Sequence, residues 1–190
     1  MQINFKNIKP GENSSYLVPG IYKMTITNAE YQAAGNNNKK AFLKITFKAS
    51  TGELNEKFFI TDNVKTHERL QYLHTGWFGQ PCDKEFSSID EIGMYFEKLL
   101  KAKGSKYSHM VIVGGTDNGE RVYSNLPYLF IDSTSSEEKV FQPNTAEWAK
   151  YVTYKPNPSL KTDRPVVSSP DLPDSEVASS DSSFEDDLPF

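Results

Sequence analysis

The chain has 190 residues, of which 37% are hydrophobic and 13% aromatic, so one folded domain with an unpacked extension is expected. No apolar run approaches the roughly 18 residues that span a bilayer, and the first ten residues predict no signal peptide. Cys82 is the only cysteine, which excludes an internal disulfide and favours a cytoplasmic location.

Charge is divided unevenly along the sequence. Residues 163–190 hold eight acidic residues and one basic residue, a net charge of −7, whereas residues 1–162 carry a net charge of +3. A mildly basic body can attract phosphates, and an acidic tail is typical of an interaction segment. Pro, Ser and Asp dominate from Pro156 onward, so we expect a folded domain over residues 1–155 and a disordered acidic tail over residues 156–190.

Three strands are predicted in the first third of the chain, because apolar residues recur there at every second position. They cover residues 21–31, 41–48 and 53–60, and the short Gly- and Asn-containing turns between them favour an antiparallel meander. The polar arm over residues 1–16 is expected to be loose.

A change of period then predicts two helices, over residues 64–74 and 89–102. Residues 76–79 are expected to interrupt the first helix. Ser88 is expected to cap the second helix, and Gly104 fits the left-handed position that follows a helix.

Two further strands are predicted over residues 107–114 and 120–131, the latter broken at Pro127, and a short capped helix over residues 144–151. Three strands, a helical insertion and two strands follow the plan of the OB-fold, a five-stranded barrel. A ferredoxin-like order fits poorly because no helix separates the first two strands, and an immunoglobulin-like sandwich fits poorly because a helix lies in the middle. We therefore predict a mainly β protein with an OB-fold barrel.

The most specific motif is the terminal run Phe184-Glu185-Asp186-Asp187-Leu188-Pro189-Phe190. It resembles the acidic tip of bacterial and phage single-stranded DNA-binding proteins, over about the last ten residues. The resemblance implies a non-catalytic protein of DNA replication, recombination or repair, in the host cytoplasm if phage-encoded. It also implies that replication and recombination proteins bind the tip, through Asp186, Asp187, Leu188, Pro189 and Phe190. Physically, the Phe190 ring and α-carboxylate call for an apolar pocket rimmed by Arg or Lys.

The polar faces of the second and third strands carry residues suited to a single strand of nucleic acid. Sequence-neutral binders combine a basic groove with aromatic faces on which bases stack. Phe42 and Phe59 stand at otherwise polar positions among lysines, so we expect open ring faces there. The alternative is that both rings pack beneath a loop or beneath residues 133–155. The predicted nucleic-acid-binding set is Lys39, Lys40, Phe42, Lys44, Lys48, Lys57, Phe59, Arg121 and Tyr123.

No catalytic, cofactor or metal site is expected, and no membrane partner. His67, His74 and Cys82 lack the fourth ligand and the paired cysteines of a structural zinc site. The glycine-rich run 114–119 lacks the Gly-Lys-Ser/Thr of a phosphate-binding loop. Two other functions stay open: a single-strand annealing protein or recombination mediator, and a protein-interaction adaptor whose tail binds a clamp or polymerase.

Overall fold

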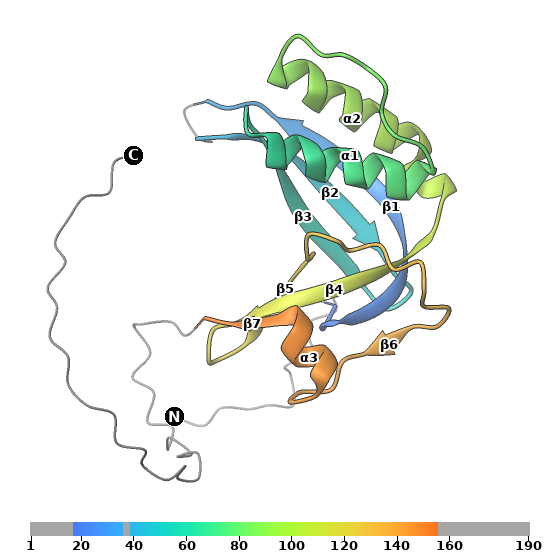
Figure 1. Cartoon of the computed structure of the whole chain (residues 1–190), viewed down its shortest axis with the longest axis vertical. Coiled ribbons are helices and arrows are strands. Elements are labelled where there is room, and N and C mark those ends of the chain that lie inside the picture. Colours follow the sequence, from blue (N-terminus) through green and yellow to red (C-terminus); the bar gives the residue numbers. More distant parts are fainter. Residues whose placement is uncertain (1–16, 36–38, 156–190) are drawn as a thin grey trace, which may run out of the picture. The chain divides into compact units, whose positions relative to one another are not determined.

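The computed structural model of the chain describes residues 17–35 and 39–155 (Figure 1). The predicted arm, the tail and the acidic tip Asp186–Phe190 lie outside these described residues. The protein is mainly β, with its principal helices between the third and fourth strands, as predicted. In chain order the elements are β1 (Gly20–Gln32), β2 (Ala41–Lys48), β3 (Glu53–Ile60), α1 (Val64–Phe78), α2 (Ile89–Lys103), the 3-10 turn η2 (Gly104–Lys106), β4 (His109–Asp117), β5 (Val122–Asn125), β6 (Lys139–Val140), α3 (Ala146–Tyr151) and β7 (Val152–Tyr154).

The strands of the described residues form one sheet. Its main path runs β3-β2-β1-β4-β5, with β6 paired to β1 and β7 paired in parallel to β4. The antiparallel meander of β1, β2 and β3 is confirmed. The long strand β1 pairs with β4 through its first half and with β2 through its second half, with a register shift between Ile26 and Asn28. Such an irregularity bends a strand, so β1 can pair with both β4 and β2 although these two strands run in different directions.

The core lies between α1 and α2 and one face of β1, β2 and β3, which we call the inner face (Figure 1). The predicted alternation holds there, since Met24, Ile45 and Phe58 are almost completely buried. Each such side chain contributes about 1.5–3 kcal/mol when it leaves water. The helices contribute buried side chains that close over this face, namely Leu70, Leu73, Trp77, Phe96 and Leu100. Within the described ranges, no helix combines the length and the apolar character needed to cross a bilayer.

The prediction that residues 76–79 interrupt the first helix is wrong. α1 runs to Phe78 and ends at Gly79, whose φ of 76° lies in the left-handed region that glycine tolerates. Tertiary packing extends the helix, because Trp77 is fully buried and its indole N–H donates to the Gly104 carbonyl at 3.0 Å. Gly76 is suited to its place in the helix, since a Cβ there would lie 2.4 Å from the Ile131 side chain.

The start of α2 follows the prediction, but its end does not. The Glu91 N–H donates to Ser88 Oγ at 3.2 Å, and the Glu91 carboxylate accepts hydrogen bonds from Ser87 that lower its pKa. Gly104 has a φ of −56° and is not left-handed, so that expectation is wrong. The glycine is needed for a close approach instead, because a Cβ at Gly104 would lie 2.9 Å from the Ile26 Cβ.

The fifth strand is shorter than predicted. β5 ends at Asn125, before Pro127, and the end of the predicted strand pairs with the sheet through an isolated bridge between Ile131 and Val111. The strand predicted over residues 107–114 is displaced as well and runs to Asp117. The predicted short helix is present as α3, where Thr145 Oγ1 accepts from the Trp148 N–H.

Replacing Gly93 by alanine is expected to destabilise the protein, because α2 packs closely against Tyr31 of β1 there. The added Cβ would lie 2.2 Å from the ring of Tyr31, whose hydroxyl donates to Asp90 and so resists displacement. Burial, together with Asp90, raises the pKa of Tyr31 to about 12. A contact this short places overpacking at the upper end of its range of about 1–3 kcal/mol, and better helix propensity returns about 1 kcal/mol, so we expect a net loss of about 2 kcal/mol in chemical denaturation.

Gly35→Ala is the matched control, because among the described residues, chain neighbours aside, no heavy atom lies within 4 Å of a Cβ at that position. It should leave the unfolding free energy within about 0.5 kcal/mol of the parent. A Gly93→Ala protein as stable as the parent would show that α2 does not sit on Tyr31 as described.

Candidate nucleic-acid interface

The face of β2 and β3 turned away from α1 and α2, which we call the outer face, carries five of the nine predicted binding residues in register. Along the two strands, Phe42 pairs with Phe59, Lys44 with Lys57, Thr46 with Asn55, and Lys48 with Glu53. None of these side chains belongs to the core cluster of the described residues. The period-two pattern therefore predicted correctly which side chains share this face, and the structure brings them into four consecutive rows.

Two lysines stand directly opposite each other on this face. Lys44 and Lys57 are cross-strand partners, so their Cβ atoms are about 5 Å apart. Like charges in this position destabilise a sheet by roughly 0.2–1 kcal/mol, and fold stability alone gives no reason to place them there. Glu30 of β1 lies opposite Lys44 on its other side and is exposed. Glu30 offsets part of the repulsion, and the row Glu30–Lys44–Lys57 keeps a net charge of +1 that an added anion would neutralise.

The two aromatic rings of the outer face differ in exposure. Phe59 is 48% exposed and can offer its ring to a ligand, whereas Phe42 is only 5% exposed. The expectation of an open ring at Phe42 is wrong for the protein as described. The rings of Phe42 and Phe59 lie edge to face with their centroids 6.1 Å apart, and Lys57 Nζ lies 4.6 Å from the Phe42 centroid.

A groove continues the outer face toward β5. It has a volume of about 410 Å³, and the exposed ring of Tyr123 and the side chain of Asn55 are among its walls. The Arg121 guanidinium lies over the Tyr123 ring, 4.4 Å from its centroid. The full lining is Glu53, Leu54, Asn55, Arg121, Val122, Tyr123 and Ser124. From Phe59 to Asn55 the strand covers about 13 Å, so the two exposed rings stand at opposite ends of one surface.

β3 and β5 contact each other at this groove, although they are not neighbours in the strand pairing. Side chains link the two segments beneath it. The Glu56 carboxylate on the inner face of β3 accepts from Arg69 of α1 at 3.3 Å and from the Leu126 N–H at 3.3 Å. Arg69 also donates to the Leu126 carbonyl at 3.3 Å. Burial raises the pKa of Glu56, and the Arg69 charge opposes that shift.

The remaining predicted residues lie at the two ends of the outer face. Lys48 forms an ion pair with Glu53 at 3.6 Å, which partly neutralises it. Lys39 and Lys40 are exposed and line a hollow of about 530 Å³ with residues 61–62 and 88–90. The Phe42–Phe59 row, the Lys44–Lys57 row and the Arg121–Tyr123 pair thus form one surface, while Lys39, Lys40 and Lys48 border it.

Sequence reasoning missed two residues of this region. Asn55 follows the same alternation as Lys57 and Phe59, and that signal alone could have found it; its amide oxygen accepts from Thr46 Oγ1 at 2.8 Å. Tyr154 of β7 is 55% exposed, and its hydroxyl lies beside Gly119 in the β4–β5 turn. It falls where the hydrophobic pattern is weak, so no sequence signal pointed to it.

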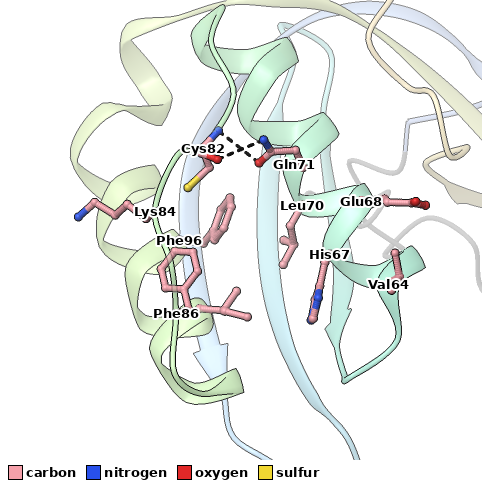
Figure 2. Close-up of a pocket in the computed structure, with 10 residues that line it drawn as sticks. Val64, His67, Glu68, Leu70, Gln71, Cys82, Lys84, Phe86 and Phe96 are labelled. Carbon is pink, nitrogen blue, oxygen red and sulfur yellow. Dashed lines mark hydrogen bonds between the residues drawn. The ribbon is translucent and has the colours of Figure 1, made fainter.

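A larger groove, of about 550 Å³, lies between α1 and α2 (Figure 2). The Gln71 side chain forms two hydrogen bonds of 3.2 Å with the Cys82 backbone, and these hold residues 82–86 along the groove (Figure 2). The floor is apolar, with Leu70, Phe86 and Phe96, and this groove lacks the rows of cations and exposed rings found on the outer face.

His67 and Cys82 also line the α1–α2 groove, whereas His74 Nδ1 is hydrogen-bonded to the Gln80 carbonyl at 2.7 Å. Within residues 17–35 and 39–155, no three His, Cys, Asp or Glu side chains are grouped to hold a metal ion. The outer face, with its lysines and exposed rings, is therefore the better candidate site for a ligand that carries negative charge and flat rings free to stack.

Comparison of the chain with protein-family models, curated proteins and solved structures gave no match.

Proposed function

We propose that the chain is a non-catalytic single-stranded DNA-binding protein of DNA replication or recombination, with little sequence preference. The outer face would hold the strand, and the tip Asp186–Phe190 would recruit other replication or recombination proteins. The proposal joins two independent supports: the residues gathered on the outer face, and the resemblance of the terminal run to the tips of such proteins.

The strand path supports an OB-type barrel as the scaffold. In the described order β3-β2-β1-β4-β5, the end strands β3 and β5 contact each other, which is the order of a five-stranded OB barrel. β6 and β7 would then be additions to the barrel, and α1 and α2 the insertion between its third and fourth strands. In this fold, oligonucleotides bind on the face of the second and third strands, where the lysine and phenylalanine rows lie.

The single observation that carries the proposal is the opposed pair Lys44–Lys57 beside the Phe42–Phe59 pair. A phosphate between the lysines would relieve their repulsion, and the adjacent exposed ring of Phe59 would receive a base. Duplex bases are already stacked on each other, so rings of this kind favour a single strand. Nothing in the pair reads a base edge, which agrees with binding of many sequences.

Fluorescence anisotropy with a labelled single-stranded oligothymidylate (dT), with duplex DNA and with single-stranded RNA tests the proposal. We expect tightest binding to dT, with log affinity falling against log salt by about 0.7 per phosphate neutralised. Equal or tighter binding of the duplex, or a flat salt response, would contradict it. Accelerated pairing of complementary strands in the same samples would favour the annealing alternative, and no oligonucleotide binding at all would favour the adaptor.

Lys44→Gln is expected to separate stability from binding. The substitution removes the repulsion with Lys57 but also the attraction to Glu30, each worth roughly 0.2–1 kcal/mol, so the unfolding free energy should stay within about 1 kcal/mol of the parent. The same change removes one phosphate contact, so the salt slope for dT should become shallower by about 0.7. Urea denaturation and salt titrations measure the two quantities on one sample.

Lys101→Gln is the control, because this exposed lysine lies on α2 and pairs with Glu97 at 2.7 Å. It should leave the salt slope unchanged. The assignment of Lys44 as a phosphate contact would be wrong if its replacement left the salt slope at the parent value.

A further inference from the structure

A cation lies over one face of each of two aromatic rings of the proposed surface in the free protein. Lys57 Nζ lies 4.6 Å from the Phe42 centroid, and the Arg121 guanidinium lies 4.4 Å from the Tyr123 centroid. Phe42 is the extreme case, since it is 5% exposed although it lies on the outer face and outside the core cluster. Its neighbours on the outer face are Lys57, Phe59 and Gln32, its cross-strand partner on β1, and a ring buried there calls for an explanation other than packing in the core cluster.

The position of Lys57 follows from its neighbours. Its direct partner Lys44 repels it, and the ring of Phe42 lies diagonally across the same strand pair. The side chain therefore leans away from Lys44 and over the ring, which attracts a cation through its negative face. Four rotatable carbon–carbon bonds allow the ammonium group to leave that position easily.

The relative strengths of the contacts favour an exchange. An exposed cation–ring contact favours its formed state by roughly two- to fivefold. One base stacked on a ring strengthens binding of the strand by roughly 5- to 150-fold. A phosphate also offers the displaced cation a charge-assisted hydrogen bond. A base that replaces the cation on the ring, with its phosphate taking up the cation, therefore gains more than it loses.

We propose that Lys57 and Arg121 are ring covers that single-stranded DNA displaces: each cation moves from its ring to a phosphate, and a base takes its place on Phe42 or Tyr123. The proposal rests on the proposed function and adds Phe42 as a stacking residue that is hidden until the strand binds. Because Phe42 and Phe59 lie edge to face, displacement of Lys57 from Phe42 would give two adjacent rings on which bases can stack.

Proton–carbon NMR of the lysine side chains tests the exchange. In the free protein, the ε-methylene protons of Lys57 should be shifted upfield by the Phe42 ring, and saturating dT should remove that shift. Lys84 over Tyr95 at 4.8 Å and Lys150 over Tyr151 at 5.0 Å are internal controls that should keep their shifts. Loss of one signal in Lys57→Arg assigns the resonance.

Persistence of the Lys57 shift in a protein saturated with dT would overturn the ring-cover proposal and leave the proposed function standing. Absence of any dT binding by anisotropy would overturn both.

Phe42→Leu provides a second measurement. It keeps the apolar volume and the Lys57 charge but removes the ring, so dT affinity should fall at least about fivefold, the lower limit for one stacked base. Circular dichroism should first show that the variant is folded. A folded Phe42→Leu protein with parental affinity would mean that Phe42 only fills space, and would overturn its role as a stacking residue.

Discussion

The double variant Phe59→Ala, Tyr123→Ala is expected to bind a dT oligonucleotide at least about 30-fold more weakly than the parent, because each stacked base contributes about 1–3 kcal/mol. Both rings are nearly half exposed, at 48% and 45%, so their loss should cost little folding energy. The salt slope should stay close to the parental value, since no phosphate contact is removed. Anisotropy titrations at several salt concentrations measure both quantities.

Tyr107→Ala is the matched control for this variant. Tyr107 is 41% exposed and packs against Phe78 at the end of α1, on the helical side of the protein. Its loss should leave dT affinity unchanged within about twofold. Parental affinity of the double variant would remove the outer face as the stacking surface, whatever the control does.

Arg69→Ala is expected to destabilise the protein by about 3 kcal/mol, the largest loss of stability that we predict. The substitution removes a partly buried ion pair with Glu56, a hydrogen bond to the Leu126 carbonyl and a contact with the Phe58 ring at 4.6 Å. Breaking one side of a buried pair costs about 3–5 kcal/mol because the other charge is left without compensation. The side chains of Arg69 and Glu56 are 25% and 16% exposed, so we expect the cost to lie at the lower end of that range.

The stability deficit of Arg69→Ala should depend on pH. Burial raises the pKa of Glu56, and without Arg69 only the Leu126 N–H still opposes that shift, so the folded-state pKa rises further above the ordinary value of 4.5. A group with a raised folded-state pKa contributes stability below its unfolded pKa and loses that contribution as pH rises. The difference between variant and parent should therefore grow from pH 4.5 to pH 7.

Urea denaturation at several pH values within that range measures the effect. More acid conditions are unsuitable, because Asp132, whose pKa is lowered to about 2 by hydrogen bonds from Ser135 and Thr134, loses its own contribution there. Arg121→Ala is the control: it too removes a guanidinium from an aromatic ring, but an exposed one, and should cost less than about 1 kcal/mol. A pH-independent deficit in Arg69→Ala would show that Glu56 is not the group left unpaired.

The outer face was predictable because one simple rule governs it. A period of two assigns every second residue of a strand to one face, so the sequence alone was enough to place Lys44 and Phe59 together. The same rule put Glu56 on the inner face, where a carboxylate is out of keeping with its apolar neighbours. Its partner Arg69 comes from α1, and only the tertiary structure reveals that match.

Other features were not predictable because distant contacts decide them. Gly76 and Gly104 both carry local signals for helix ends. At Gly76, however, α1 continues, because the buried Trp77 indole donates a hydrogen bond to the Gly104 carbonyl. Close packing against Ile26 determines the conformation at Gly104. β6 has two residues and β7 three, too few for any periodic pattern to show. The cover over Phe42 depends on side-chain positions that a strand pattern does not specify.

Photo-crosslinking tests the central claim, that a single DNA strand lies across β2, β3 and β5, most directly. A dT oligonucleotide carrying 5-iododeoxyuridine would be bound to the full chain, irradiated, and the attached peptides identified by mass spectrometry. We predict adducts on Phe59 and Tyr123, lost in the respective alanine variants. Adducts confined to the α1–α2 groove, or spread without preference over the surface, would contradict the account.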